Sequence, residues 1–446
     1  MKRIISLILS AICVFSCSML SGCGEKKNNN ALVYFLNFKP ESAVVYEELA
    51  KKYEEEKGVK VKVVTAAANT HEQTLKSEIA KTEAPTIFQV NGPIGYNSWR
   101  DYCLDIKDSK IYSYLSDKSL AIKDGDGIYA VPYVVEGYGI IYNNAIMDKY
   151  FALKDRQNKI NSMKEITNFD TFKTVVEDMS KHKNELGIDG VFASTSLLSG
   201  EDWRWQTHLL NIPLYYEYKG KEGKDPTLSL LEAGEIAFKY EKNFKNIFDL
   251  YVENSVTSKK LLGSKSVADS MAEFALGKAA MVQNGNWGWS QIAGVQGNTV
   301  KSEDIKMLPI YTGIEGEEKQ GICIGTENYF AINKNVSEEK RKASLEFLDW
   351  LFSSETGKKY VTEKLGFISP FNTFKQNERP NDPLAKEIDR YLNDDKIETI
   401  PWIFTAFPSE NFKKEVGSAL LDYVQGESDW QTFKKKVIDK WKSERD

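Results

Sequence analysis

Hydrophobic and polar positions follow a regular order over the first sixty residues after position 30. Apolar runs at 31–38, 59–65 and 86–90 predict strands, the first and third buried and the second alternating. The segments between them, 41–58 and 70–84, carry apolar side chains near helical spacing and predict helices. This β-α-β-α-β order predicts an α/β protein with a mostly parallel sheet and helices on its faces.

Polar residues stand near the carboxyl ends of these predicted strands, and segment 91–99 is expected to turn away from the third strand. In parallel sheets, ligands bind in the crevice outside the carboxyl ends of the strands. We therefore expect this end of the sheet to supply ligand-binding side chains. The candidates are Lys39, Glu41, Asn69, Asn91 and Tyr96.

Residues 127–146 form an unusually long extended apolar stretch that Pro132, Gly137 and Gly139 interrupt. Such a stretch predicts one strand that passes from one lobe to another, with the glycines easing the crossing. After it the pattern is mostly helical. Helices are expected near 168–183, 231–254, 267–277 and 337–353, and short strands at 191–195, 279–283, 305–310 and 328–334.

The first residues have the features of a secretory signal. Lys2 and Arg3 precede an apolar stretch from Ile4 to Phe15, which is too short to cross roughly 30 Å of hydrocarbon as a stable helix. A charged start, a short apolar core and small residues near its end predict a signal peptide over residues 1–22.

Charge and length exclude several classes of function. Removal of residues 1–22 takes away two basic residues and no acid, so the formal net charge falls from -5 to -7. An acidic body argues against a nucleic-acid partner, which favours a basic face. The remaining 424 residues suffice for two domains. No other segment approaches 18 consecutive apolar residues, so no further membrane span is predicted.

Cysteine and histidine positions show no metal-site spacing. Cys103 and Cys323 lie far apart, and two buried free thiols are favoured over a disulfide because the spacing marks no disulfide framework. His71, His182 and His208 are also widely separated. The sequence therefore predicts neither a metal site nor a cofactor.

The sequence Leu20-Ser21-Gly22-Cys23 resembles the lipobox of bacterial lipoproteins. The resemblance implies that the chain is cut before Cys23, whose thiol carries a lipid. Because each buried methylene contributes about 0.8 kcal/mol, two or three acyl chains hold a protein durably on a membrane. Residues 23–30 are then a lipidated tether. We expect a protein anchored in the cell membrane and facing the extracellular side.

Three further stretches together resemble the extracellular solute-binding proteins of bacterial ABC importers, of the maltose-binding type. They are "LVYFLNF" with the helix and strand that follow it, "YAVPYVVEGYGIIYNNAIM" and "FALGKAAMVQNGNWGWSQI". The later "FLDWLFSSETGKKYVTEKLGFISPF" is similar to that family's helix pair after the second crossover.

The resemblance implies a type II clamp, a two-lobed α/β fold with an interlobe cleft and a hinge. It implies residues 31–137 and 303–358 for lobe 1, and 138–302 and 359–446 for lobe 2. It further implies a monomer that is not an enzyme, that captures a carbohydrate by lobe closure and that docks on a membrane permease.

Residues that match the family's sugar contacts are Glu136, on the crossover stretch, and Trp287, in N-G-N-W-G-W. An aromatic face packs on a sugar ring, and a carboxylate accepts hydrogen bonds from hydroxyls. The maltose-binding type carries an acid and a base after its third strand, where this chain has Asn91-Gly92-Pro93, so maltodextrin specificity is not implied. Other candidates are Asn286 and one of Trp203 and Trp205.

The other tryptophans divide between core and cleft. Trp350, Trp430 and Trp441 lie in helical patterns and are predicted core residues, and Trp289 is a predicted packing residue. For Trp99 the sequence leaves two alternatives, a place in the cleft or in the core, and the same two alternatives hold for Trp402.

Two alternative functions remain open. Tyr215-Tyr216 could bind ferric iron in a clamp of the same general type. Glu41 and Glu136 could serve an anchored glycosidase, which needs two carboxylates roughly 5–9.5 Å apart. Loops rich in tryptophan and amide side chains favour sugar over metal, and the absence of a barrel's repeated βα units from the sequence pattern argues against the glycosidase.

Overall fold

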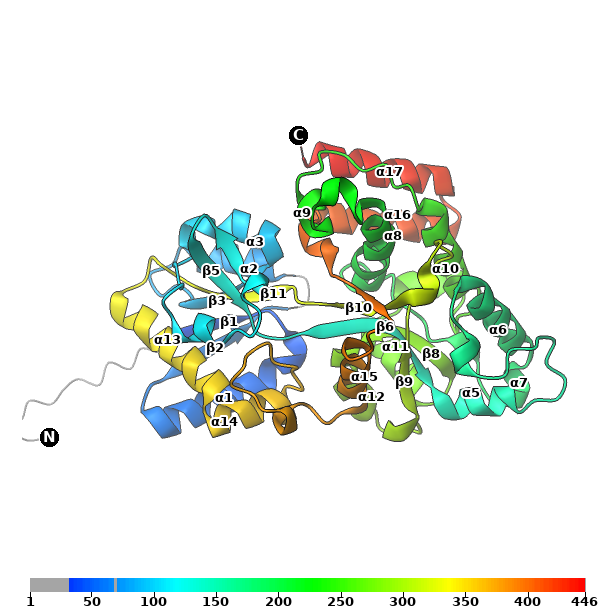
Figure 1. The fold of residues 1–446 in the computed structure, drawn as a ribbon, viewed down its shortest axis with the longest axis horizontal. Helices are drawn as coiled ribbons and strands as arrows, with labels where there is room; N and C mark the ends of the chain where they lie inside the picture. Colours follow the sequence, from blue (N-terminus) through cyan, green and yellow to red (C-terminus); the bar gives the residue numbers. More distant parts are fainter. Residues whose placement is uncertain (1–31, 68–69, 446) are drawn as a thin grey trace, which may run out of the picture. The chain divides into compact units, whose positions relative to one another are not determined.

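The computed structural model describes residues 32–67 and 70–445, and residues 31–446 form one compact unit. This part of the chain contains two β-sheets, each covered by helices (Figure 1). The predicted signal peptide, Cys23 with its tether, and Asn69 lie outside the described residues.

The first sheet begins with the parallel strands that the sequence predicts. Strand β1 pairs in parallel with β2 and β3, while β11 pairs antiparallel with β3 and β5, and β5 with β4. The parallel prediction is therefore confirmed for one half of the sheet. The order across it is β2 (Val61–Thr65), β1 (Val33–Asn37), β3 (Ile87–Asn91), β11 (Asn328–Ile332), β5 (Gly127–Pro132), β4 (Ile122–Asp124).

Helices cover both faces of this sheet because successive side chains of β1 point to opposite sides. Phe35 packs in a core cluster with α1 (Ala43–Lys57) and α13 (Glu338–Ser353), and Leu36 packs with α2 (His71–Glu78) and α3 (Gly92–Trp99). Gly58 ends α1 at φ 69°, as its position predicts.

Residues 92–99, which are expected to turn away from the third strand, form helix α3, and Pro93 fits its first turn. One expectation for this region is wrong. Helix α2 ends at Glu78, six residues before the predicted end.

The long apolar stretch passes between the two sheets, as predicted, but as two strands. Strand β5 ends at Pro132 in the first sheet, and β6 (Glu136–Asn143) belongs to the second. Gly139 is needed for close packing, since a Cβ there would lie 2.5 Å from the Leu308 carbonyl oxygen. The residues expected to extend the strand beyond Asn143 start helix α5 (Asn144–Phe151).

The second sheet is organised around β6, which pairs with β8 on one side and with β10 and then β9 on the other. The assignment of all of 303–358 to lobe 1 is therefore wrong for β9 and β10. The chain returns to the first sheet only at Thr326–Glu327. The strands are β12 (Glu398–Ile400), β10 (Gln320–Gly325), β8 (Ala279–Gly285), β7 (Gly190–Phe192) and β9 (Ile305–Leu308).

The boundary at residue 359 is also contradicted. Phe367 and Phe371 pack into the same core cluster as β1 and α13, so the segment after α13 still belongs with the first sheet. Sequence periodicity shows which face of a segment is buried, and it does not show against which sheet.

Helices α6, α10 and α11 match expected helices at 168–183, 231–254 and 267–277, although α10 is shorter than predicted. Phe238 adopts φ 50°, which interrupts the helical backbone before α10 starts. A π-helical turn, Arg204–Leu209, precedes α8. The remaining helices are α4 (Lys110–Tyr114), α5, α6 (Phe169–Lys181), α7 (Lys183–Leu186), α8 (Leu210–Tyr218), α9 (Pro226–Leu231), α10 (Glu241–Glu253), α11 (Val267–Ala275), α12 (Trp289–Ala293), α14 (Glu355–Lys359), α15 (Pro383–Leu392), α16 (Glu410–Gln425) and α17 (Trp430–Ser443).

Several packing predictions are confirmed. Trp350, Trp430 and Trp441 are buried in hydrophobic clusters. Cys103 and Cys323 are buried free thiols. In the part of the chain that the structure describes, no helix has the length and apolar character needed to cross a membrane.

Candidate functional site

A cavity of about 770 Å³ lies among segments from both sheets. One wall follows β1, α2 and β3. The opposite wall comes from the π-helical turn, α11, the segment after β8, and α16. The lining residues are Phe38, Lys39, Pro40, Glu41, His71, Glu72, Asn91, Glu136, Glu201, Trp203, Gln206, Thr207, His208, Val267, Ala268, Met271, Trp287, Ser290, Gln291, Gly294, Val295, Glu327, Glu410 and Lys413.

Most of the sequence-predicted residues meet in this cavity. Lys39 and Glu41 follow β1, Asn91 ends β3, and Glu136 begins β6. Trp203 and Trp287 face them from the second sheet's side. These residues are distant in sequence and adjacent in space.

Trp205 and Tyr96 do not line the cavity. Of the two alternatives at 203 and 205 the cavity contains Trp203, whereas the expectation for Tyr96 is wrong. Trp205 is 1% exposed and packs edge-on against Phe248 and Tyr251. Because residues two apart on a helix face different directions, only Trp203 of the pair reaches the cavity. Tyr96 is also buried, and its hydroxyl donates to Asp124 at 2.9 Å.

Asn286 is the third residue that lies outside the lining. Its Oδ1 accepts a hydrogen bond of 2.9 Å from the backbone N–H of Gly137. This bond joins the crossover strand to the turn that carries Trp287. Asn286 therefore supports two residues of the cavity wall without contacting the cavity.

A buried ion pair joins the two sides of the cavity, since Lys39 follows β1 of the first sheet and Glu136 begins β6 of the second. The Lys39 Nζ donates to both carboxylate oxygens of Glu136, at 2.8 and 3.0 Å, and lies 3.7 Å from Glu41. Burial alone would lower the pKa of Lys39, but the carboxylates of Glu136 and Glu41 outweigh it and raise that pKa above its usual value. Lys39 is therefore held as a cation.

Further charged residues, which the sequence analysis missed, line other parts of the cavity. Lys413 donates to Glu410 at 2.8 Å, and the Lys413 ammonium lowers the pKa of Glu410. Burial raises the pKa of Glu327 to about 7, although Lys39 and Lys413 act in the opposite direction. Glu327 follows β10 at the second crossing between the sheets. Its position after a strand was the signal that could have identified it.

Two more missed residues come from α2. Burial lowers the pKa of His71 to about 4, so its imidazole is neutral at pH 7. Glu72 accepts a hydrogen bond of 2.7 Å from the Trp99 indole, and burial raises the pKa of this carboxyl. Trp99 itself is buried in a core cluster of the first sheet, together with Leu36. Of the two alternatives, cleft or core, Trp99 therefore takes the core.

An aromatic group forms the opposite wall. The ring centroids of Trp203 and Trp287 lie 6.0 Å apart, and His208 lies 5.0 Å from the first and 5.5 Å from the second. Gly285 makes room for Trp287, since a Cβ there would lie 2.1 Å from the indole ring. Trp402 is buried behind this group, 6.2 Å from Trp287.

Several buried polar atoms of cavity-lining side chains have no hydrogen-bond partner within the described residues. They are His71 Nε2, Asn91 Oδ1, Gln206 Oε1, His208 Nδ1 and Gln291 Oε1. A buried polar group without a partner costs free energy, so such groups favour a polar ligand that supplies the missing bonds.

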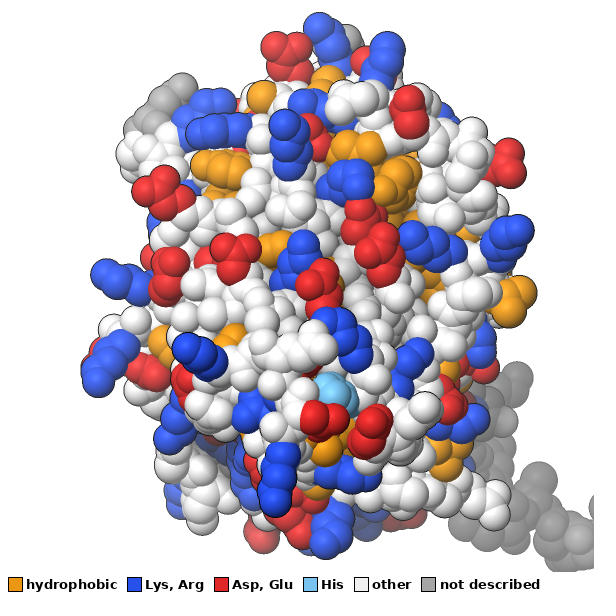
Figure 2. Space-filling model, turned by 90° about the vertical axis from the view of Figure 1, so that its right-hand side faces the viewer, with side chains coloured by type: hydrophobic (Ala, Val, Ile, Leu, Met, Phe, Trp, Pro, Cys, Tyr) orange, Lys and Arg blue, Asp and Glu red, His pale blue; other side chains and the backbone are white. Residues whose placement is uncertain are grey.

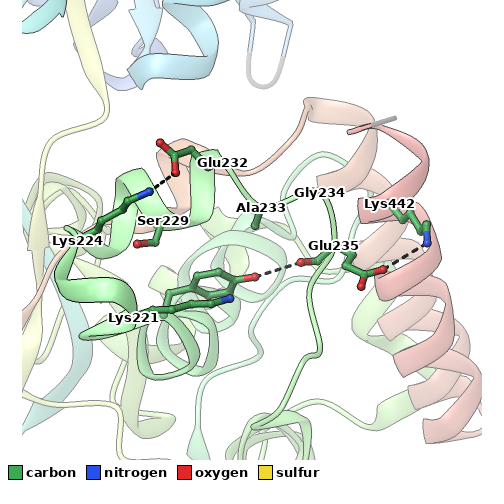
Figure 3. A pocket seen from close by; sticks show the side chains of 9 residues that line it. Lys221, Lys224, Ser229, Glu232, Ala233, Gly234, Glu235 and Lys442 are labelled. Atoms are coloured by element: carbon green, nitrogen blue, oxygen red, sulfur yellow. Dashed lines mark hydrogen bonds and ion pairs between the residues drawn. The ribbon is translucent and has the colours of Figure 1, made fainter.

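A smaller hollow of about 460 Å³ lies near α9 and α17 (Figure 3). Two of its lysines pair with glutamates: Lys224 contacts Glu232 at 2.7 Å, and Lys442 contacts Glu235 at 3.3 Å. Among its lining residues Tyr218 alone is aromatic, and the Lys221 ammonium lies 4.6 Å from the centroid of that ring. The larger cavity, which two tryptophans line, is therefore the stronger candidate site.

The tyrosine pair considered for iron lies away from the cavity. Tyr215 donates to Glu398 at 2.9 Å and Tyr216 to Gln320 at 3.0 Å. Both hydroxyls are engaged in bonds within the second lobe. The paired tyrosines therefore offer no support for iron binding in the cavity.

Comparison with known proteins decides the family. A sequence profile for the bacterial extracellular solute-binding protein family matches residues 48–387, about three quarters of the chain. This chain belongs to that family. No curated protein matches the chain significantly by sequence.

Solved structures share the two-lobed fold of this solute-binding family member. RafE in complex with raffinose has a TM-score of 0.68 and 18% identity, over 93% of this chain and 99% of that chain. A chitin oligosaccharide binding protein has a TM-score of 0.69 and 17% identity, over 93% of this chain and 98% of that chain. A sugar transporter from Bacillus licheniformis in complex with stachyose has a TM-score of 0.66 and 16% identity, over 92% of this chain and 100% of that chain.

Proposed function

We propose that this protein is the substrate-binding component of an ABC importer, and that it captures an oligosaccharide in its cavity and delivers it to a membrane permease. The observation that carries the proposal is the pairing of an aromatic wall, Trp203 and Trp287, with a charged wall around Lys39 and Glu136. It is supported by membership of the extracellular solute-binding family.

The chemistry of the two walls suits a sugar. The apolar C–H face of a pyranose packs on an aromatic ring, while its hydroxyls both donate and accept hydrogen bonds. Carboxylates and ammonium groups supply both kinds of partner here. The volume of about 770 Å³ lies within the range of about 300–1,000 Å³ that is usual for small-molecule sites.

The ligands of similar structures favour an oligosaccharide. Raffinose, a chitin oligosaccharide and stachyose belong to three structures that share this fold. We propose that the lobes, one around each sheet, close on such a ligand by bending at Tyr133–Val135 and Thr326–Glu327, where the chain crosses between the sheets.

The charge of the cavity favours a neutral sugar over an anionic one. Six glutamates and two lysines line it, and both lysines already pair with carboxylates. A uronate or a phosphorylated sugar would bring a further negative charge against this excess.

Calorimetric titration tests the proposal. Purified protein is titrated with raffinose, stachyose, chitin oligosaccharides and oligogalacturonate. We expect saturable binding of at least one neutral oligosaccharide and none of the uronate. No release of reducing sugar is expected, because the proposed role is capture without hydrolysis. Failure to bind any of the neutral sugars, or hydrolysis that depends on Glu136, would contradict the proposal.

We further propose that the protein is a monomer anchored by a lipid on Cys23, facing the extracellular side. The support is the Leu20-Ser21-Gly22-Cys23 sequence and the polar residues after it. In the Cys23→Ala variant we expect no lipid incorporation, with the protein uncleaved or shed into the medium. Membrane retention and processing equal to the parent would contradict the anchor.

A further inference from the structure

A second cluster of charged groups surrounds His182, in the second lobe and away from the cavity. His182 lies between α6 and α7 and is 8% exposed. Its Nδ1 lies 3.9 Å from Asp155 Oδ2 and 4.0 Å from Glu185 Oε1, and its Nε2 lies 3.8 Å from Asp178 Oδ1. Figure 2 shows the face of the molecule that carries α6 and α7, on which acidic and basic side chains are interspersed.

These distances are too long for hydrogen bonds between the imidazole and the three carboxylates, because such bonds to oxygen measure about 2.7–3.2 Å. Nε2 is buried and has no partner within the described residues. A neutral imidazole carries one N–H and one lone pair. With a carboxylate facing each nitrogen, either tautomer directs a lone pair at a negative charge, so the arrangement favours a bound cation.

The two sides of the ring differ in what holds the carboxylates. Asp178 is buried and fixed, since it accepts hydrogen bonds of 2.9 Å from the Tyr150 hydroxyl and the Asn158 amide. The side chains of Asp155 and Glu185 are 69% and 51% exposed. Apart from His182, the structure gives these two carboxylates no partner among its described residues.

We propose that His182 Nδ1, Asp155 and Glu185 bind a divalent transition-metal ion, with zinc as the expected metal. The three ligand atoms lie within 4.8 Å of one another. Zinc binds nitrogen and carboxylate oxygen at about 2.0–2.2 Å and takes water as a fourth ligand. The two exposed carboxylate oxygens, at 3.9 and 4.0 Å from Nδ1, would move inward to reach tetrahedral spacing around the metal.

Asp178 completes the site as a positioning residue. A metal-binding histidine usually donates its other ring N–H to a carboxylate, which fixes the tautomer and the ring orientation. Asp178 stands on the Nε2 side and directs the Nδ1 lone pair toward Asp155 and Glu185. The metal would tie the loop after α5 to the junction of α6 and α7.

Zinc binding by the full-length protein tests the inference, at about pH 8, where an unperturbed imidazole is deprotonated. Calorimetry, cobalt(II) absorption and the melting temperature are measured after chelation and dialysis. The parent is compared with His182→Ala and with Asp155→Asn/Glu185→Gln. The matched control is Glu177→Gln, an exposed carboxylate on α6 whose partner is Lys173 at 3.7 Å. Any zinc bound by cysteine thiols is the same in all four proteins and does not affect the comparison.

We expect the parent and Glu177→Gln to bind one more zinc ion than the other two variants, and to melt several degrees higher with zinc. The double variant changes only exposed side chains, so it keeps the test valid if His182→Ala fails to fold. Equal zinc binding by the parent and the double variant would overturn the inference. Oligosaccharide binding uses other residues, so either result leaves the proposed function standing.

Discussion

The two walls of the cavity differ in how their residues are held. On the charged wall, Lys39 is fixed by Glu136 and Glu41, so its ammonium is held by two carboxylates. On the aromatic wall, Trp203 and Trp287 contact each other through their rings and present apolar surface. Removing one partner of a buried ion pair leaves an uncompensated charge, whereas trimming a ring at the cavity surface removes contact area for the ligand. We therefore expect changes on the charged wall to affect stability first and changes on the aromatic wall to affect affinity first.

The largest expected effect is that of Lys39→Met on the charged wall. This change leaves Glu136, 2% exposed, without its cation. We expect the free energy of unfolding to fall by about 3–5 kcal/mol, measured by urea denaturation. The control is Lys39→Met/Glu136→Leu, which removes both charges and should recover most of the loss. A single variant as stable as the parent would contradict the comparison of the walls.

The next effect concerns the aromatic wall. Trp287→Ala should weaken oligosaccharide binding by about 2 kcal/mol or more, about thirtyfold, because no neighbour replaces the lost ring. The measurement is calorimetric titration with the best sugar of the panel, together with the melting temperature. If the affinity is unchanged, the assignment of Trp287 is wrong, and Trp203 becomes the candidate for stacking on the sugar.

Two controls separate binding from packing in that experiment. Trp289→Ala alters a partly buried residue outside the lining and should leave affinity near that of the parent. Trp350→Ala should instead cost roughly 3–5 kcal/mol of stability, with little effect on affinity in the folded fraction.

A smaller effect is expected at the contact between crossover strand and turn. Asn286→Ala removes the hydrogen bond to the Gly137 N–H and should lower the free energy of unfolding by about 1–3 kcal/mol, since the buried donor loses its partner. Affinity should fall less than in Trp287→Ala. A greater loss of affinity in the asparagine variant would show that Asn286 contacts the ligand itself.

The smallest effect is a change in pH dependence. The folded protein holds the Glu327 proton up to a pKa of about 7, whereas the unfolded chain releases it near the ordinary value of 4.5. Native protein therefore binds more protons across this window, and stability falls as pH rises through it. Glu327→Gln should flatten that fall, measured by urea denaturation at about pH 5 and about pH 8. An unchanged slope would contradict the assignment.

Local signals in the sequence predicted much of the fold and part of the site. Periodicity placed α1 and its end at Gly58, the parallel strands β1 to β3, and a crossing between lobes within residues 127–146. The strand that precedes Trp287 also follows from a short segment. These features were predictable because neighbouring residues determine them.

The tertiary structure decided everything that depends on distant partners. Lys39 meets Glu136 across 97 positions of the chain, and β9 and β10 pair with β6 rather than with the first sheet. Glu410 and Lys413 appear as an ordinary helix start in the sequence, yet they reach the cavity because α16 packs beside the π-helical turn. Apolar spacing identifies the buried face of a helix or strand, but the choice of partner depends on how whole surfaces fit together. For that reason Trp203 faces the cavity while Trp205, two residues later, fills the core.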